Sequence, residues 1–277
     1  SARQHNLKAA CAERRAPAAN LFGSPSLPMA ARAILLVTAV GSAFASSSGC
    51  SLRRLHGTSN SLDWRKDALR VVREMCLKAA DNSCADRDIY QFGVFGGKSV
   101  KQMLFAANCS KTPVHTFWGF DSFQGLPDED KSNFTGGVDK KYGAGKYSSS
   151  AALKLTGKAL FDRIERYIGF DQRVRWVKGF YNESLTRDLA RQRGMRPASY
   201  VDIDADLYTS SAQALEWLVA SGLIVAGTVI GYDDWSFSDQ ANGGEKRAHE
   251  EIIARAFGRR VERLAGCGPN AACFQVS

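Results

Sequence analysis

Hydrophobic and polar residues follow two periods along most of the chain. Between residues 62 and 80 the apolar positions recur every three or four residues, which predicts an amphipathic helix. Short apolar, β-branched or aromatic runs predict strands at 89–94, 114–120, 173–177, 198–203 and 223–232. Helical patterns lie between and after them, at 99–107, 151–168, 185–192, 210–220 and 245–257.

This alternation predicts an α/β fold. Strands that alternate with helices indicate a doubly wound, mostly parallel sheet with helices on both faces. Two further runs, 259–264 and 272–276, follow each other closely and predict an antiparallel C-terminal hairpin, which makes seven strands. We find no internal repeat and no second core, so one domain is expected over 62–277.

The stretch 122–150 has no period and is rich in Gly, Pro, Ser and charges. It is too long for an ordinary connection, and loops of this length are usually functional. We expect it to be a lid that selects the acceptor.

Carboxylates gather where two predicted strands end. Asp202, Asp204 and Asp206 alternate along DIDADLY, and the pair Asp233-Asp234 closes the next apolar run. Alternate residues of a strand share a face, and three like charges side by side require a positive partner. Because ligands bind beyond the carboxyl ends of parallel strands, which lie about 4.8 Å apart, we expect these acids to converge on one divalent ion. The alternatives are that Asp204 orients Asp206 or caps a helix, and that Asp233-Asp234 is a solvated turn.

The chemistry of these acids favours Mg²⁺. Carboxylates are hard oxygen ligands, and no Cys or His stands beside them, which disfavours zinc. Bound Mg²⁺ would lower the pKa of a substrate hydroxyl and hold it in position.

A glycine-rich turn, QFGVFGGKS, joins the first strand to the following helix. Glycines let the backbone approach a ligand, and a helix N-terminus offers free N–H groups, although such turns also occur without a ligand. The turn lacks the patterns of dinucleotide and NTP binders, which favours a ligand with a ribose and no phosphate. Asp121, at the end of the second strand, is placed to accept hydrogen bonds from ribose hydroxyls; the alternative is a helix cap or a turn.

Five motifs together resemble a known family. QFGVFGGKS, GFDSFQGLPDE, VKGFYNESL, DIDADLY and YDDW, in this order and spacing, resemble the macrocin O-methyltransferase family, over about residues 86–257. Its members are class I methyltransferases with a Rossmann-like fold that transfer a methyl group from S-adenosylmethionine to sugar hydroxyls. The resemblance implies a small hydroxylated acceptor.

The resemblance also implies roles for individual residues. Mg²⁺ would be bound by Asp206, Asp233 and Asp234, and the catalytic candidates are Asp204 and Asp206. The cofactor would be held by residues of the glycine turn and of the second strand's end, namely Gln91, Gly93, Gly96, Gly97, Ser99, Asp121, Ser122 and Phe123. Of these, Asp121 and Ser122 would hold the ribose, and Phe123 could stack on adenine or on the acceptor, as could Trp235 and Phe237.

Two departures from the family limit this transfer. The first strand of such enzymes usually carries Glu where this chain has Gln91. The sugar enzymes are expected to use a His as proton acceptor, but His5 and His56 lie in the N-terminal tail, and His115 and His249 fit structural positions. The general base is therefore not assigned, beyond Asp204 as a candidate.

Two other functions compete with methyl transfer. A non-catalytic protein that keeps the cofactor fold is the alternative, and the retained acids argue against it. A dinucleotide oxidoreductase is the third, which an NAD(P)H binding test would support or remove.

The net charge, the N-terminal tail and the cysteines give expectations about the protein's cellular compartment and binding partners. The net charge of +9 comes largely from residues 1–61, and the rest of the chain is near balance without a basic stripe, which disfavours nucleic acid. That tail combines a signal-like apolar run, too short to span a membrane, with an acid-free stretch of transit-peptide composition. It predicts an organelle, either a plastid or a secretory lumen; a disordered tail on a cytoplasmic protein is the alternative. Cys267 and Cys273 could form a disulfide in an oxidising lumen, and a homo-oligomer is possible.

Overall fold

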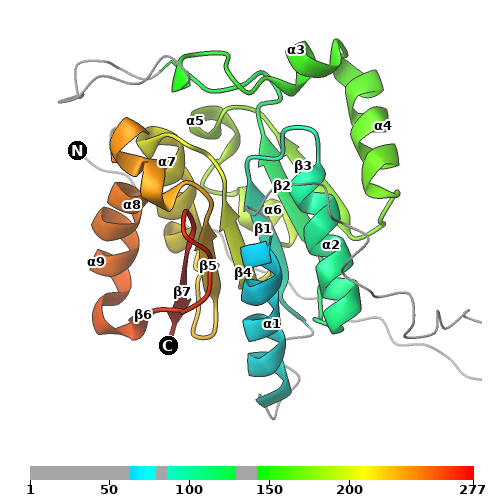
Figure 1. Ribbon diagram of the computed structural model, residues 1–277. Helices are drawn as coiled ribbons and strands as arrows, with labels where there is room; N and C mark the ends of the chain where they lie inside the picture. Colours follow the sequence, from blue (N-terminus) through cyan, green and yellow to red (C-terminus); the bar gives the residue numbers. More distant parts are fainter. Residues whose placement is uncertain (1–62, 79–85, 129–141, 242) are drawn as a thin grey trace, which may run out of the picture. The chain divides into compact units, whose positions relative to one another are not determined.

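The computed structural model of this protein describes residues 63–78, 86–128, 142–241 and 243–277 (Figure 1). All of them belong to one of the two units into which the chain divides, Cys50–Ser277. The predicted targeting tail and residues 129–141 of the predicted lid lie outside the described residues. No helix in the described ranges is long and apolar enough to cross a membrane.

The described residues form a sheet in the order β3-β2-β1-β4-β5-β7-β6. The strands are β1 (Asp88–Phe92), β2 (Phe117–Asp121), β3 (Val174–Lys178), β4 (Ala198–Ile203), β5 (Val229–Tyr232), β6 (Val261–Arg263) and β7 (Ala272–Val276). Neighbours among β1 to β5 pair in parallel, and β7 pairs antiparallel with both β5 and β6. The predicted seven-stranded, mostly parallel sheet with an antiparallel C-terminal hairpin is confirmed.

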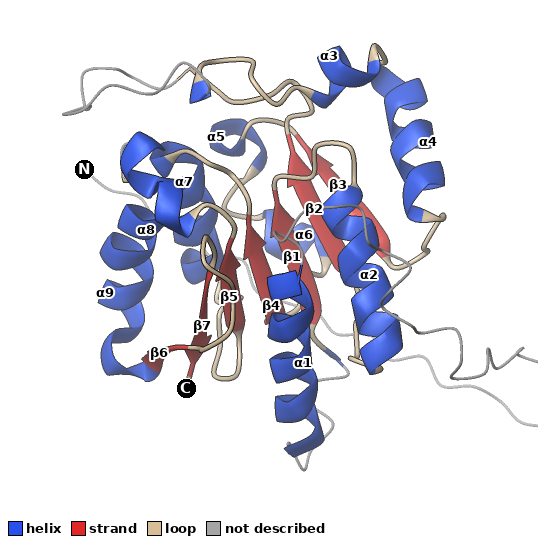
Figure 2. Ribbon diagram, viewed as in Figure 1, coloured by secondary structure: helices blue, strands red, loops and turns tan. Residues whose placement is uncertain are grey.

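Helices cover both faces of this sheet (Figure 2). One face is packed against α1 (Asp63–Lys78), α2 (Lys98–Ser110) and α4 (Gly157–Ile168). The other face carries α5 (Tyr181–Ser184), α6 (Leu189–Arg193), α7 (Tyr208–Ala220) and a C-terminal helix, which consists of α8 (Gly244–Ala248), a π-helical turn (His249–Ile253) and α9 (Ala254–Phe257). The short helix α3 (Ser149–Leu153) precedes α4, and 3₁₀ turns lie at Trp235–Ala241 and Gly258–Arg260.

A polar row crosses the middle of the sheet on the face of α1 and α2. Gly119, Gln91, Asp202 and Gly231 lie in register on β2, β1, β4 and β5. Gln91 and Asp202 are fully buried, so each needs a partner from a covering helix. The two glycines leave room for aromatic rings, because a Cβ atom at Gly231 would lie 2.5 Å from the ring of Trp64.

Three predicted elements end elsewhere than expected. The strand predicted at 223–232 contains ladder pairs only from Val229, because the chain turns at Gly227, whose φ is +86°. The helix predicted at 151–168 breaks after Leu153, where Lys154 adopts a left-handed conformation. The segment predicted as one helix at 185–192 begins after α5 has ended at Ser184, and it is helical only from Leu189, where α6 starts.

Candidate functional site

A cavity of about 670 Å³ opens at the carboxyl ends of β1, β2, β4 and β5. Its walls include the glycine turn after β1, Asp121 and Ser122 after β2, and the acids that follow β4 and β5. A cavity of this size suits a small molecule together with a cofactor. The predicted meeting of these strand ends is therefore found.

The glycine turn is fixed by contacts within the protein. Gly93 has φ +93°, and a Cβ atom there would overlap the carbonyl oxygen of Asp204, so only glycine allows β1 and the loop after β4 to approach so closely. Asp121 Oδ2 accepts the N–H groups of Val94 (2.7 Å) and Phe95 (2.8 Å). Asp121 thus ties the turn to the end of β2.

The pKa of the Asp121 carboxyl group is raised above its ordinary value. Burial raises the pKa of its carboxyl group, and hydrogen bonds from the backbone N–H groups of Phe95, Phe123 and Val94 oppose that rise. Within the described part of the chain, Oδ1 accepts only the N–H group of Phe123, so this oxygen keeps a lone pair for a ligand hydroxyl.

Arg65, which projects from the start of α1, holds three acids of the cluster. Its Nε atom lies 3.0 Å from both carboxylate oxygens of Asp202, its Nη2 atom 2.9 Å from Asp204 Oδ2, and its Nη1 atom 3.2 Å from Asp233 Oδ1. Burial alone would lower the pKa of Arg65, but the three carboxylates outweigh it and raise the pKa above its ordinary value. The guanidinium group, only 3% exposed, therefore stays charged beside the cavity that it lines.

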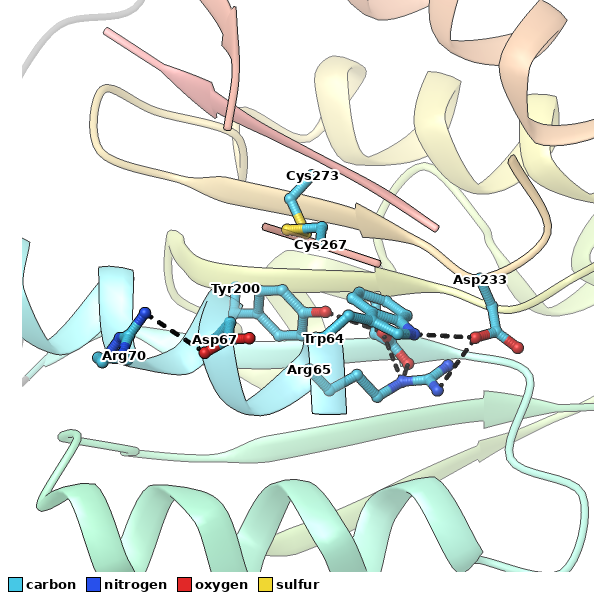
Figure 3. Close-up of a disulfide and its surroundings, with 9 residues drawn as sticks. Trp64, Arg65, Asp67, Arg70, Tyr200, Asp233, Cys267 and Cys273 are labelled. Carbon is cyan, nitrogen blue, oxygen red and sulfur yellow. Dashed lines mark hydrogen bonds and ion pairs between the residues drawn. A yellow bond between two sulfur atoms is a disulfide. The ribbon is translucent and has the colours of Figure 1, made fainter. Parts of the chain in front are cut away.

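Trp64 adds a second contact from the same helix (Figure 3). Its indole N–H donates to Asp233 Oδ1 over 3.1 Å, and Arg65 reaches the same carboxylate alongside the ring. The disulfide Cys267–Cys273 belongs to the same buried cluster as Trp64, so the hairpin of β6 and β7 packs against the start of α1.

Asp206 and Asp234 form a separate acid pair. Their side chains hydrogen-bond each other. The pKa of Asp206 lies well above its ordinary value, mainly because of burial and also because of the neighbouring Asp234 carboxyl group. Two carboxyl groups this close cannot both be ionised without a positive partner. The pKa of Asp204 is also raised, mainly by burial and then by the negative charge of Asp233, whereas the positive charge of Arg65 opposes this rise.

Glu245, in the first turn of α8, joins the two acidic loops. Its carboxylate accepts the N–H of Asp234 over 2.9 Å and that of Ala205 over 3.4 Å. Glu245 is fully buried, and burial raises its pKa well above the ordinary value. The loops after β4 and β5 thus share one anchor beneath the cavity.

A family model decides between the competing functions. The model described as macrocin O-methyltransferase (TylF) matches residues 66–251, which include the glycine turn and both acidic loops. The chain belongs to the macrocin O-methyltransferase family. It is therefore an S-adenosylmethionine-dependent O-methyltransferase, as the resemblance of its five motifs implied.

Solved structures of other methyltransferases share the fold. The O-methyltransferase NovP superposes with a TM-score of 0.57 at 20% sequence identity, over 77% of this chain and 80% of that one. The calicheamicin methyltransferase CalS11 superposes with a TM-score of 0.55 at 18% identity, over 76% of this chain and 77% of that one. The comparison with curated proteins found no match.

The predicted cofactor residues of this methyltransferase fall into two groups. Gly93, Ser99, Asp121 and Ser122 line the cavity. The other four, Gln91, Gly96, Gly97 and Phe123, are not among its lining residues. Gln91 donates instead to Gly93 O and Ser99 Oγ behind the turn, and a Cβ atom at Gly97 would touch two isoleucines of α4.

Phe123 is placed differently from our expectation. It is only 1% exposed and packs edge-on against Phe161 and Trp176, with ring centroids 4.9 and 6.4 Å away. Its backbone turns through a φ of +58°, which directs the side chain into the core beside α4. The aromatic residues that line the cavity are Phe95, Tyr147, Phe180 and Tyr181, and none of them was singled out as a site residue from the sequence. Phe95 and Tyr147 are about half exposed.

The predicted metal ligands of the methyltransferase, Asp206, Asp233 and Asp234, do not form one site of three carboxylates. Among the described residues, no group of three His, Cys, Asp or Glu is arranged to hold a metal ion. The physical reason is that Arg65 and Trp64 take Asp233 Oδ1, while Asp206 contacts Asp234. The strand that was expected to align three acids also ends at Ile203, and Asp206 lies beyond it with φ +58°.

Both histidines of the described chain lie away from the cavity. His249 bonds Tyr232 and is enclosed by Trp235 and Phe274, and burial lowers its pKa to about 4. His115 bonds Asp88 near the start of β2. Neither lines the cavity, which agrees with the structural positions expected for them.

Proposed function

We propose that this enzyme transfers the methyl group of S-adenosylmethionine to a hydroxyl group of a small, sugar-like acceptor with the assistance of Mg²⁺. The observation that carries the proposal is the shared cavity, because it is lined both by the glycine turn with Asp121 and by the acids after β4 and β5. The cofactor's sulfonium group and the acceptor's hydroxyl can therefore meet within one enclosed space.

The cofactor occupies the side of the glycine turn in this proposal. Gly93 and Ser99 line that part of the cavity for the methionine portion, and Asp121 with Ser122 faces the ribose. The half-exposed ring of Phe95, at the same wall, is available to stack on adenine. Asp121 accepts a ribose hydroxyl with the lone pair of Oδ1 that its backbone bonds leave open.

The acceptor occupies the acidic side. Members of the family methylate sugar hydroxyls. Of the two similar structures, NovP is an O-methyltransferase and CalS11 is a calicheamicin methyltransferase. The acids of this wall can accept hydrogen bonds from several acceptor hydroxyls, and Asp204 and Asp206 are the catalytic candidates that face them.

The pair Asp206 and Asp234 fits Mg²⁺ better than the expected set of three ligands that also included Asp233. Mg²⁺ is typically bound by one or two carboxylates, with water and substrate oxygens as the other ligands. Asp206 and Asp234 provide two carboxyl groups in contact with each other at the cavity wall, where a positive partner would stabilise both as anions. When bound, Mg²⁺ lowers the pKa of a coordinated hydroxyl and fixes its orientation.

Turnover assays on hydroxylated acceptors test the proposal. We expect methyl transfer from S-adenosylmethionine to at least one polyol or glycoside, lost on removal of divalent ions and restored by Mg²⁺. Asp206→Asn should abolish the Mg²⁺-dependent activity and leave cofactor affinity within about threefold, since Asp206 lies on the acceptor side. The exposed Asp162→Asn serves as the matched control. Equal loss of cofactor binding and turnover in Asp206→Asn would refute this division of roles.

A further inference from the structure

Arg65 lies immediately before the part of the chain that the family model matches, and the function proposed above does not use it. It nevertheless bonds two acids of the cavity wall, Asp204 and Asp233, and the fully buried Asp202 behind them. Asp204 and Asp233 follow different strands, so one side chain from α1 connects the loops after β4 and β5. An arginine can do this because its planar group carries five donors in fixed directions.

The positions of the bonded oxygens indicate what Arg65 replaces. Asp204 Oδ2 and Asp233 Oδ1 bond the two Nη atoms of one guanidinium group, so these oxygens converge on a single small volume. Carboxylate oxygens from two strand ends that converge on one volume make a cation site, and here the cation is part of the protein. The Asp206–Asp234 pair lies outside these contacts.

We propose that Arg65 is a positioning residue that acts as an internal cation. It holds Asp204 and Asp233 in place and excludes an added metal ion from them, which confines divalent ions to Asp206 and Asp234. The metal part of this inference rests on the proposed function. The exclusion follows from charge, since a guanidinium group already within about 3 Å of both carboxylates repels a second cation there.

The test removes Arg65 without leaving a lone buried charge. Arg65→Met keeps the length of the side chain, and Asp202→Asn removes the fully buried carboxylate that would lose its partner while keeping an oxygen for the Tyr200 hydroxyl. This pair of substitutions preserves net charge. A matched control lies on the same helix, where Arg70→Met with Asp67→Asn removes an exposed ion pair (Figure 3).

Divalent-ion binding is measured by calorimetry with Mn²⁺, in proteins that also carry Asp206→Asn to disable the acid pair. The protein with Arg65→Met, Asp202→Asn and Asp206→Asn should bind Mn²⁺ at least about tenfold more tightly than Asp206→Asn alone, because Asp204 and Asp233 become available. The control pair should not change Mn²⁺ binding. Arg65→Lys in the Asp206→Asn protein should keep Mn²⁺ binding weak, because the positive charge is retained.

Cofactor binding shows that the variants are folded, and S-adenosylmethionine affinity should stay within about threefold because the ion pairs of Arg65 go to Asp202, Asp204 and Asp233. A folded triple variant that gains no Mn²⁺ affinity overturns the assignment, since a merely structural arginine would change stability alone. Mn²⁺ binding by the unaltered protein is read separately. Its absence there would remove Mg²⁺ from the proposed function and leave the comparison of the Arg65 variants intact.

Discussion

At the scale of single residues, the acids of the site were visible in the sequence and their partners were not. DIDADLY and YDDW identify carboxylates at strand ends, and the cavity contains Asp204, Asp206, Asp233 and Asp234. Which acid meets which cation depends on contacts across more than 130 residues, such as those of Arg65. One signal was available, because Arg65 falls on the apolar stripe that continues through residues 68, 69 and 72, where a charge must have a buried partner.

Asp121 tests the cofactor side of the cavity. Asp121→Asn should weaken S-adenosylmethionine binding by at least about tenfold, because an amide offers one acceptor atom where the carboxylate accepts three backbone N–H groups and faces the ligand. Calorimetric titration of the cofactor measures the effect. The exposed Asp188→Asn is the control, and unchanged affinity in Asp121→Asn would remove Asp121 from the cofactor site.

His249 predicts a pH dependence of stability. Its folded pKa of about 4 lies below the unfolded value of about 6.5, so the unfolded chain binds more protons between these values. The contribution of neutral His249 to the free energy of unfolding is therefore fully present above pH 6.5. It should fall by about 3 kcal/mol as the pH decreases to 4.

The measurement is the free energy of unfolding by urea at pH 7 and pH 5, for the unaltered protein and for His249→Gln. The substitution should flatten the part of the pH dependence that His249 contributes. His115→Gln, which removes a more exposed ring, is the control for the loss of an imidazole. Equal slopes in all three proteins would contradict the prediction.

At the scale of elements, alternation of strand and helix predicted the order of the chain well, but local conformations moved several boundaries. Hydrophobic runs such as 223–232 do not show where pairing begins, because Leu223 and Ile224 are buried in the core without belonging to a strand. The π-helical turn at His249–Ile253 likewise leaves the helical pattern of 245–257 intact. Element type is set by periodicity, whereas element ends depend on left-handed residues such as Lys154.

Gly231 tests how α1 is seated on the sheet. Gly231→Ala should destabilise the protein by about 1–3 kcal/mol, because the added methyl group would meet the ring of Trp64 at 2.5 Å and the hydroxyl of Tyr200. Denaturant unfolding measures the loss. Gly96→Ala, where a Cβ atom meets nothing within 4 Å, should leave stability unchanged, and similar losses in both variants would contradict this account of the helix contact.

At the scale of the whole molecule, the cysteines bear on the compartment. Cys267 and Cys273 form the disulfide that their spacing allowed, and Cys76 and Cys109 are also disulfide-bonded. Disulfides persist in oxidising compartments and are rare in reducing ones. We propose an organelle, as the N-terminal tail predicts, and the disulfides favour one with an oxidising lumen.

Thiol labelling tests the disulfides. In protein purified without reductant, Cys267 and Cys273 should resist alkylation even after denaturation and should react once a reductant is added, as mass spectrometry of their peptides would show. Reduction should also lower the midpoint of thermal unfolding, because the bond closes the loop between β6 and β7. Alkylation of both cysteines without reductant would argue against an oxidising compartment.

The seating of Trp64 and Arg65 has a practical consequence for anyone who shortens this protein. The matched family region begins at residue 66, one position after the arginine that bonds three acids of the fold. A truncated enzyme designed on that boundary would retain all five sequence motifs, yet it would start with uncompensated negative charge at its centre. A shortened enzyme that keeps these contacts must therefore begin upstream of Trp64.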